Sequence, residues 1–171
     1  MKSHQQFSLQ KYNSFGVLAT TPAIYYPKNE QELQLLSKIT NESFYILGEG
    51  SNTLFVEDIT PVIIKPEFLG IRVSETKLFY EVVAACSENW HDLVCFCINQ
   101  GINGLENLAL IPGSVGAAPV QNIGAYGVDV AHFIESVTWF DFEENKSMQL
   151  TNAQCKFEYR DSIFKQSLKN K

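Results

Sequence analysis

The segment 112–127 constrains this chain more than any other part of its sequence. It reads PGSVGAAPVQNIGAYG, with four glycines, three alanines and no charged residue, and it follows neither a helical nor a strand period. Small side chains let a backbone come close to a flat ring system or a diphosphate, and a long loop inside a compact domain is usually functional. We therefore interpret the segment as a ligand-binding loop in which Gln121 and Asn122 hydrogen-bond ring carbonyls and nitrogens. A buried structural loop is the alternative.

A second glycine-rich segment, 48–52, follows the short apolar run 44–47. A glycine-rich turn after a strand lets successive amides point into one concavity, and such a nest binds pyrophosphate without a lysine. The side chains of Ser51 and Asn52 add donors. The dinucleotide-binding Rossmann pattern is not met, because residue 53 is Thr53 rather than a third glycine, and a strand-like run follows. An ordinary tight turn is the alternative interpretation.

Length and charge narrow the class of protein. The chain has 171 residues, 45% of them hydrophobic, and a formal net charge of −6. This length suits one domain or two small lobes. No basic run exceeds two residues, which argues against nucleic-acid binding, so backbone amides would have to hold an anionic ligand. Because the sequence has neither a signal-peptide pattern nor about 20 consecutive apolar residues, we expect a cytoplasmic protein without membrane association.

The cysteines and histidines do not indicate a metal site. No C-x-x-C pair occurs, so we expect reduced, partly buried thiols, consistent with the cytoplasm. No histidine has a ligand partner at helical or hairpin spacing, so we expect these side chains to be structural or solvent-exposed. The cysteines are Cys86, Cys95, Cys97 and Cys155. The histidines are His4, His91 and His132.

The N-terminal third reads as a small α/β unit after a loose leader, residues 1–14. Apolar periodicity predicts a helix over 30–39. Asn29 is its predicted N-cap, and Glu32 falls at the N3 position of a capping box. Three short strands are expected, over 44–47, 54–56 and 62–64.

The remaining sequence predicts more strands and a second helix. A strand is expected over 78–85, followed by an amphipathic helix over 88–100 that Ser87 caps at its start and Gly101 at its end. Alternation then predicts strand positions within 134–142. The expected C-terminal elements are a hairpin partner over 148–150 and one helical turn over 152–155.

A third candidate site is the segment 159–162, which reads YRDS. Its Arg160 could clamp a substrate carboxylate through two parallel hydrogen bonds, because the guanidinium fork matches carboxylate geometry. A surface turn containing Arg160 and Asp161 is the alternative, and spacing by itself favours that alternative.

Four segments together carry a resemblance to a known family. The segments 47–52, 104–113, 116–127 and 159–165 occur in order and resemble the UDP-N-acetylenolpyruvoylglucosamine reductase family, also called UDP-N-acetylmuramate dehydrogenase. The resemblance implies an α+β, two-lobed FAD-binding domain of the vanillyl-alcohol-oxidase type. It has a small α/β lobe over 15–66 and a mainly antiparallel lobe with helices over 67–171.

The resemblance also implies a reaction. The family binds FAD, which NADPH reduces, and passes hydride to the enolpyruvyl group of a nucleotide sugar, giving UDP-N-acetylmuramate for the peptidoglycan of the cell wall. The resemblance makes Arg160 the catalytic residue, stabilising negative charge on the substrate carboxylate. The family's proton-donating serine and late glutamate belong to a C-terminal substrate-binding domain, and we expect this chain to be truncated before it. A non-catalytic FAD-binding module and a plain interaction domain are the alternatives.

The predicted cofactor-binding residues come from the two glycine-rich segments, which we expect to lie close together around one FAD. They are Gly48, Glu49, Gly50, Ser51, Asn52, Ile111, Pro112, Gly113, Gly116, Ala117, Gln121, Asn122, Ile123, Gly124 and Tyr126.

Overall fold

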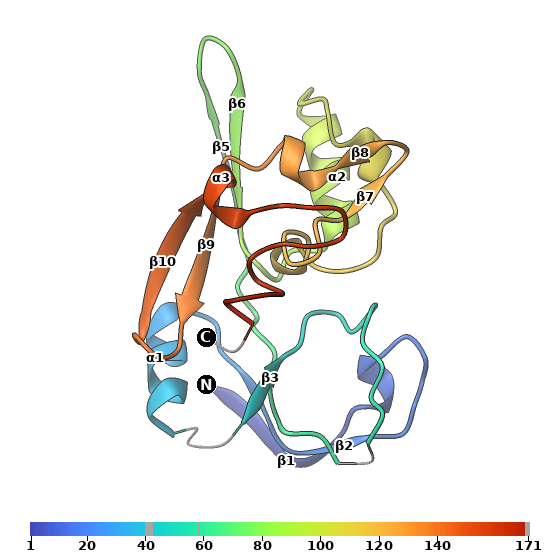
Figure 1. The fold of residues 1–171 in the computed structure, drawn as a ribbon, viewed down its shortest axis with the longest axis vertical. Coiled ribbons are helices and arrows are strands. Elements are labelled where there is room, and N and C mark those ends of the chain that lie inside the picture. Colours follow the sequence, from blue (N-terminus) through green and yellow to red (C-terminus); the bar gives the residue numbers. More distant parts are fainter. Residues whose placement is uncertain (40–42, 58, 170–171) are drawn as a thin grey trace. The chain divides into compact units, whose positions relative to one another are not determined.

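The computed structural model describes residues 1–39, 43–57 and 59–169 (Figure 1). The chain divides into two compact units. Unit 1 comprises Met1–Phe68 and Phe140–Lys146, and unit 2 comprises Leu69–Trp139 and Ser147–Lys171. The first break follows Phe68, near the lobe boundary expected after residue 66, while the functional assignment of the two lobes stays a prediction.

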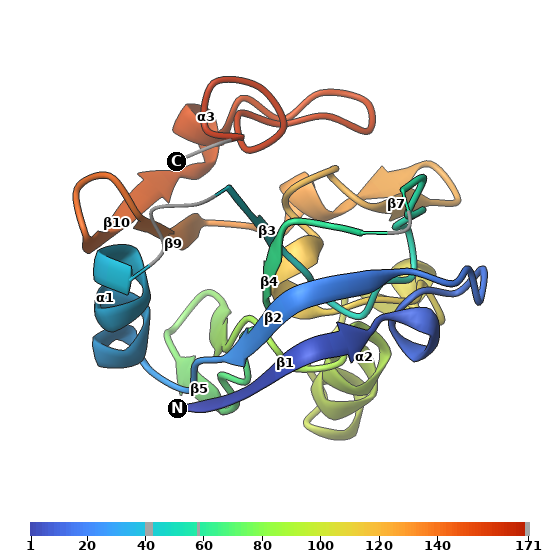
Figure 2. The same cartoon turned by 90° about the horizontal axis from the view of Figure 1, so that it is seen from below.

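Unit 1 is built on a four-stranded mixed sheet. Its strands are β1 (Lys2–Ser8), β2 (Thr20–Tyr26), β3 (Phe44–Ile46) and β4 (Val62–Ile64), in the spatial order β1-β2-β4-β3. β1 runs antiparallel to β2, whereas β2 and β3 each run parallel to β4. The long β1–β2 pair is clearest in the second view (Figure 2).

The first strand corrects the prediction of a loose leader. Residues of β1 pair with β2 from Lys2 opposite Tyr26 to Ser8 opposite Thr20, and the ladder skips the pair formed by Gln6 and Pro22. Proline has no N–H to donate at that point, and Gln6 adopts a φ of +46°. The sequence conceals this strand because most of its side chains are polar and exposed.

The helix predicted over 30–39 is confirmed as α1 (Glu30–Ile39). Asn29 caps it as predicted, since its Oδ1 accepts from the amide of Glu32 at 3.0 Å. The Glu32 carboxylate accepts instead from the amide of Lys28, not Asn29 as a capping box requires, at 2.9 Å. This backbone hydrogen bond is the largest of the effects that lower the pKa of Glu32.

Two apolar clusters hold unit 1 together. On the α1 side, Leu33 and Leu36 pack with Ile64 and with nearby phenylalanines, including Phe140 and Phe142. Full burial of one such leucine contributes about 1.5–3 kcal/mol. The second cluster contains Leu9, Ala19, Ile24, Tyr26, Leu47, Phe55 and Ile63.

The strand predicted over 54–56 is wrong. Its alternation is present, because Phe55 is buried while Leu54 and Val56 are exposed. No described residue pairs with this segment as a strand, so it remains extended chain. Alternating burial predicts a strand only where a neighbouring backbone completes the ladder.

Unit 2 contains antiparallel hairpins and helices. The first hairpin joins β5 (Ile71–Glu75), which was not predicted, to β6 (Tyr80–Ala84). α2 (Trp90–Asn99) follows. Later β9 (Ser136–Asp141) pairs with β10 (Lys146–Thr151), whose central residues belong to the predicted hairpin partner; the end of β9 and the first residue of β10 are part of unit 1. The predicted helical turn is α3 (Asn152–Cys155).

The core of unit 2 forms on α2. Asn89, rather than the predicted Ser87, is the N-cap, because its side chain accepts from the amide of Asp92. The indole N–H of Trp90 donates to the carbonyl of Leu108 at 2.8 Å, and Gly101 follows the helix with a φ of +74°. The cluster around the helix comprises Trp90, Leu93, Val94, Cys97, Leu108, Ala118, Ile123 and Val130.

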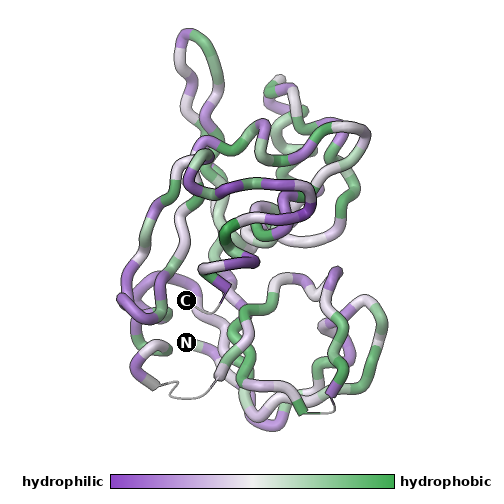
Figure 3. Tube along the Cα trace, in the orientation of Figure 1, coloured by the Kyte–Doolittle hydropathy of each residue, from purple (hydrophilic) through white to green (hydrophobic). Residues whose placement is uncertain are grey.

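The two units together confirm the predicted α+β fold class. Hydrophobic and hydrophilic residues alternate in short stretches along the trace (Figure 3).

Within the part of the chain that the structure describes, no helix combines the length and apolar character needed to span a bilayer. All four cysteines are free thiols, as predicted.

Candidate functional site

The glycine turn of unit 1, residues 48–52, directly follows β3. Gly50 is the residue that the local packing requires to be glycine. Its φ is +70°, and an added Cβ would lie 1.9 Å from the carbonyl oxygen of Tyr12. The turn is therefore pressed against the N-terminal loop, and any larger residue at position 50 would push the two apart.

Three carbonyls of the glycine turn accept hydrogen bonds from fixed donors. The ammonium of Lys65 donates to the Gly48 carbonyl at 2.8 Å. The amide of Ser14 donates to the Gly50 carbonyl at 3.2 Å, and its hydroxyl donates to the Ser51 carbonyl at 3.1 Å. The backbone direction of the turn is thus set by residues distant in sequence.

Lys65 brings a positive charge to the glycine turn. It follows β4, and its side chain is partly buried. Burial lowers its pKa, and the nearby carboxylates of Glu49 and Glu67 partly offset that shift by favouring the charged form. In a chain of net charge −6, this cation lies beside the segment predicted to bind a diphosphate.

In unit 2, the first half of the glycine-rich loop is built on the start of α2. The amide of Trp90 donates to the Gly113 carbonyl at 3.0 Å, and the amide of Gly116 donates to the Cys86 carbonyl at 2.8 Å. An added Cβ at Gly116 would lie 2.6 Å from the Cβ of Cys86. The predicted residues Gly113 and Gly116 therefore lie beside the N-terminal end of this helix and the segment that precedes it.

Most amides in the middle of this loop are already used within the protein. They donate to carbonyls of the loop itself or of the segment before α2, so they do not form an open row of donors. The amides concerned are those of Val115, Gly116, Ala117, Ala118, Val120, Asn122 and Ile123.

The second half of the loop forms a tight hairpin. β7 (Gly124–Ala125) pairs with β8 (Val128–Asp129) across Tyr126 and Gly127. Both central residues have positive φ, +53° and +79°, as a type I′ turn requires. The hairpin holds the Tyr126 ring outward, with 89% of the residue exposed.

Asn122 joins this loop to the turn that carries Arg160. Its Nδ2 donates to the Glu158 carbonyl at 3.0 Å, and its Oδ1 accepts from the amide of Ala131 at 3.1 Å. The residue is buried and has a φ of +43°. Its carboxamide therefore makes structural hydrogen bonds, and its assignment as a cofactor-binding residue stays a prediction.

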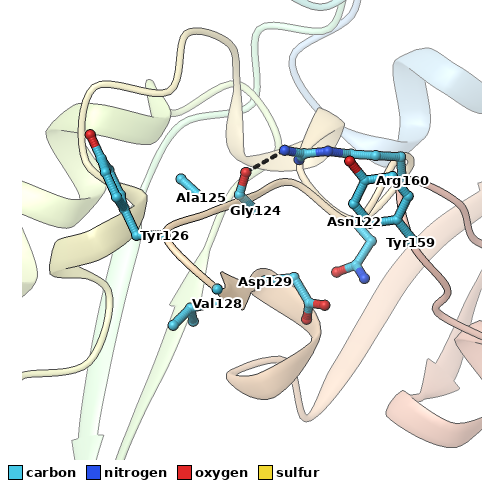
Figure 4. Close-up of a pocket in the computed structure, with 9 residues that line it drawn as sticks. Asn122, Gly124, Ala125, Tyr126, Val128, Asp129, Tyr159 and Arg160 are labelled. Carbon is cyan, nitrogen blue, oxygen red and sulfur yellow. Dashed lines mark hydrogen bonds between the residues drawn. The ribbon is translucent and has the colours of Figure 1, made fainter.

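An open cavity of about 320 Å³ lies between the hairpin and the Arg160 turn (Figure 4). The guanidinium of Arg160 extends to the Gly124 carbonyl and donates to it. The lining of the cavity combines aromatic, acidic and basic side chains with bare backbone. The lining residues are Asn122, Gly124, Ala125, Tyr126, Gly127, Val128, Asp129, Tyr159 and Arg160.

The Arg160 turn is rigidly held. Glu158 and Asp161 exchange backbone hydrogen bonds of 3.0 and 3.2 Å, and Arg160 between them has a φ of +55°. Ser162 is fully buried and donates its hydroxyl to the Val120 carbonyl at 2.6 Å. This burial gives Ser162 a structural role and removes it as a proton donor to a ligand in the cavity.

The structure brings together some of the predicted residues and adds others. Asn122, Gly124, Tyr126 and Arg160 line one cavity, whereas Gly48–Asn52 belong to unit 1, so the expectation that both glycine-rich segments hold one nucleotide stays a prediction. Sequence reasoning gave no role to Ser14, Lys65, Val128 or Asp129, for which the sequence held no signal. Tyr159 lay within the candidate segment 159–162 but was given no role there.

Comparison with known proteins identifies the class of protein. Residues 21–144 match the family described as the FAD binding domain. The chain therefore belongs to the FAD binding domain family.

Its relatives are more specific. A UDP-N-acetylenolpyruvoylglucosamine reductase from Pseudoalteromonas translucida is 49% identical over 164 residues, which cover 96% of this chain and 48% of the relative. A protein with the same name from Idiomarina loihiensis is 46% identical over 158 residues, covering 92% of this chain and 47% of that relative. The resemblance predicted from the sequence is confirmed, and the chain spans about half the length of these curated relatives.

A solved structure shares the fold. The crystal structure of UDP-N-acetylenolpyruvylglucosamine reductase (MurB) from Thermus caldophilus matches with a TM-score of 0.74 at 22% identity. The match covers 94% of this chain and 56% of the other. At this identity the likeness concerns the fold.

Proposed function

We propose that this chain is the FAD-binding part of an NADPH-dependent UDP-N-acetylenolpyruvoylglucosamine reductase. In this proposal the whole protein reduces UDP-N-acetylglucosamine enolpyruvate to UDP-N-acetylmuramate for peptidoglycan synthesis, in the cytoplasm. The observation that carries the proposal is the 46–49% identity to reductases across more than nine-tenths of the chain. Because the chain spans about half of the length of these reductases, catalytic turnover by this protein is itself a proposal.

The features of each unit fit parts of a flavin nucleotide. In unit 1, a turn with glycine at positive φ and a lysine beside it suits a diphosphate, since such turns direct backbone N–H groups at anions. In unit 2, the cavity is open and has the exposed rings of Tyr126 and Tyr159 on its lining. Aromatic faces and bare backbone suit a planar ring system.

When bound, FAD would supply the hydride chemistry, while the protein supplies orientation and charge. Arg160 is the candidate for charge stabilisation. Its hydrogen bond to Gly124 uses one of five guanidinium donors. The remaining N–H groups could pair with a carboxylate at the cavity, where a preorganised cation stabilises developing negative charge. Arginine cannot release a proton near neutral pH, so the proton must come from another group.

Flavin binding tests the first half of this proposal. FAD titrated into the purified protein should give a shifted absorbance spectrum and quenched flavin fluorescence. The midpoint of thermal unfolding should rise with FAD concentration, because a ligand that binds only the folded state stabilises it. A flat titration with protein that is folded by circular dichroism contradicts the proposal.

Turnover tests the second half. NADPH oxidation that depends on the enolpyruvyl sugar identifies a reductase, whereas flavin binding without such oxidation favours a non-catalytic FAD-binding module. An Arg160→Ala variant of an active protein should lose about 100-fold in turnover, the effect of removing one stabilising donor. Flavin binding should persist in that variant, so the two halves of the proposal can fail separately.

A further inference from the structure

We propose that Ser14 and Lys65 are positioning residues that aim the backbone amides of the glycine turn at a diphosphate. The inference rests on the proposed function, because it assumes that this turn holds the diphosphate of FAD. No sequence motif assigned a role to either residue. The structure places both against the turn through three hydrogen bonds to its carbonyls.

The argument starts from peptide geometry. In a planar trans peptide, the carbonyl of one residue and the N–H of the next point in opposite directions, and the described chain contains no cis peptide. Ser14 holds the carbonyls of Gly50 and Ser51. The amides of Ser51 and Asn52 therefore both point away from Ser14. Two successive amides directed to one side form the anion-binding nest, and the positive φ of Gly50 is the conformation such a nest requires.

Lys65 does the same at the start of the turn. Its ammonium holds the Gly48 carbonyl at 2.8 Å, which directs the amide of Glu49 away from the lysine. The charge of Lys65 also lies within the turn's surroundings, where it offsets the carboxylate of Glu49. An anion approaching the turn thus meets less negative charge than the sequence 48–52 by itself would present.

Ser14 can act as a fixed reference because the loop that carries it is cross-linked by Asn13. The buried Asn13 side chain donates to the carbonyls of Leu9 and Val17, at 3.0 and 3.2 Å, and accepts from the amide of Val17 at 3.0 Å. Ser14 itself is exposed. Its hydroxyl can therefore be removed without disturbing the packed core.

The test measures FAD affinity and apo-protein stability side by side. Ser14→Ala removes the hydroxyl donor but keeps the backbone donor, and it should weaken FAD binding by about 3- to 10-fold. Ser14→Thr retains both donors and should restore affinity. Lys65→Met should weaken binding by about 10-fold or more, because the lost hydrogen bond is charged.

Lys28→Met is the matched control for charge. Lys28 lies in the same unit and pairs with Glu67 at 3.9 Å, with no hydrogen bond to the turn. This variant removes the same unit charge and should change FAD affinity less than twofold. The thermal midpoint of apo Ser14→Ala should stay close to wild type, because the residue is exposed.

Each result has one meaning. Wild-type affinity in Ser14→Ala, an equal loss in Lys28→Met and Lys65→Met, or no recovery in Ser14→Thr overturns the positioning role. A loss of affinity that only follows a loss of apo stability does so too. If folded wild-type protein fails to bind FAD at all, the proposed function itself fails, and the variants then need no comparison.

Discussion

The two glycine-rich segments of this chain use their backbones in opposite ways. In the turn 48–52 of unit 1, outside donors hold the carbonyls of Gly48, Gly50 and Ser51, which directs the following amides away from the supporting protein. In the loop 112–127 of unit 2, most amides in the middle donate to other carbonyls of the protein. In our proposal the turn presents backbone amides to a ligand, whereas the loop forms a rigid frame for side chains.

The difference shows that glycine-rich composition does not fix how a segment binds. Glycine serves close packing in both places, against Tyr12 at Gly50 and against Cys86 at Gly116. What separates the two segments is which backbone groups are hydrogen-bonded, and that depends on contacts with distant residues. Substitutions that change the packing of the turn, the hydrogen bonds of the loop or the titrating groups of either unit test this difference.

The largest expected effect is at Gly50. Gly50→Ala forces a Cβ into the Tyr12 carbonyl and leaves alanine at a φ of +70°. It should lower the free energy of unfolding by about 3 kcal/mol or more in urea unfolding and abolish FAD binding. Gly16→Ala is the matched control, because Gly16 has a φ of +63° with no atom within 4 Å. A cost of about 1–2 kcal/mol is expected there, and equal effects would show that the turn does not press against the N-terminal loop.

The next effect tests the frame in unit 2. Asn122→Ala leaves the Glu158 carbonyl and the Ala131 amide without their partner, which should cost about 2–3 kcal/mol of unfolding free energy. Turnover of an active protein should fall further than the loss of stability explains, because the Arg160 turn loses the hydrogen bond that holds it. Asn107→Ala, at an exposed position, should stay within about 0.5 kcal/mol. If both variants match wild type, the loop is not held by its side-chain bonds.

The smallest expected effect concerns the pH dependence of the unfolding free energy, in which the two units have different titrating groups. Burial, followed by the hydrogen bond that the Tyr26 hydroxyl shares with the Tyr12 hydroxyl at 3.1 Å, raises the pKa of Tyr26 above its usual value of 10.0. The unfolded chain therefore loses this proton first, so the contribution is complete below about pH 10 and declines as pH rises further. The slope for one proton is at most about 1.4 kcal/mol per pH unit. Tyr26→Phe should reduce the slope with which the unfolding free energy of unit 1 falls as pH rises above about 10. If the slope is unchanged, the pH dependence comes from other groups, including Cys97 and Cys155 of unit 2, whose pKa values burial raises.

Local patterns predicted the elements whose causes are local. The helix α1 and its cap at Asn29 follow from periodicity and one short-range hydrogen bond. The glycine turn and the Arg160 segment were likewise found from short motifs. Alternation along the chain also predicted the position of β9, and the predicted hairpin partner and helical turn correspond to β10 and α3.

Features that depend on distant backbone were missed. β1 pairs with β2 across a ladder interrupted at Pro22, and most β1 side chains are polar and exposed, so local sequence does not show this strand. The segment 54–56 alternates without a partner strand. Ser14 and Lys65 act through carbonyls 37 and 17 positions away, a relation that only the folded chain reveals.

The left-handed backbone around the cavity has a consequence for engineering. Asn122, Tyr126 and Arg160 all bear side chains at positive φ, between +43° and +55°, where glycine would be the more comfortable residue by about 1 kcal/mol each. Glycine would relieve this backbone strain, but it would remove the Asn122 hydrogen bonds, the Tyr126 ring or the Arg160 cation, and at Asn122 the lost hydrogen bonds outweigh the relief. At Tyr126 and Arg160 of the cavity lining, thermostability and ligand recognition favour different residues. Stabilised variants of the protein are therefore better sought elsewhere in the chain.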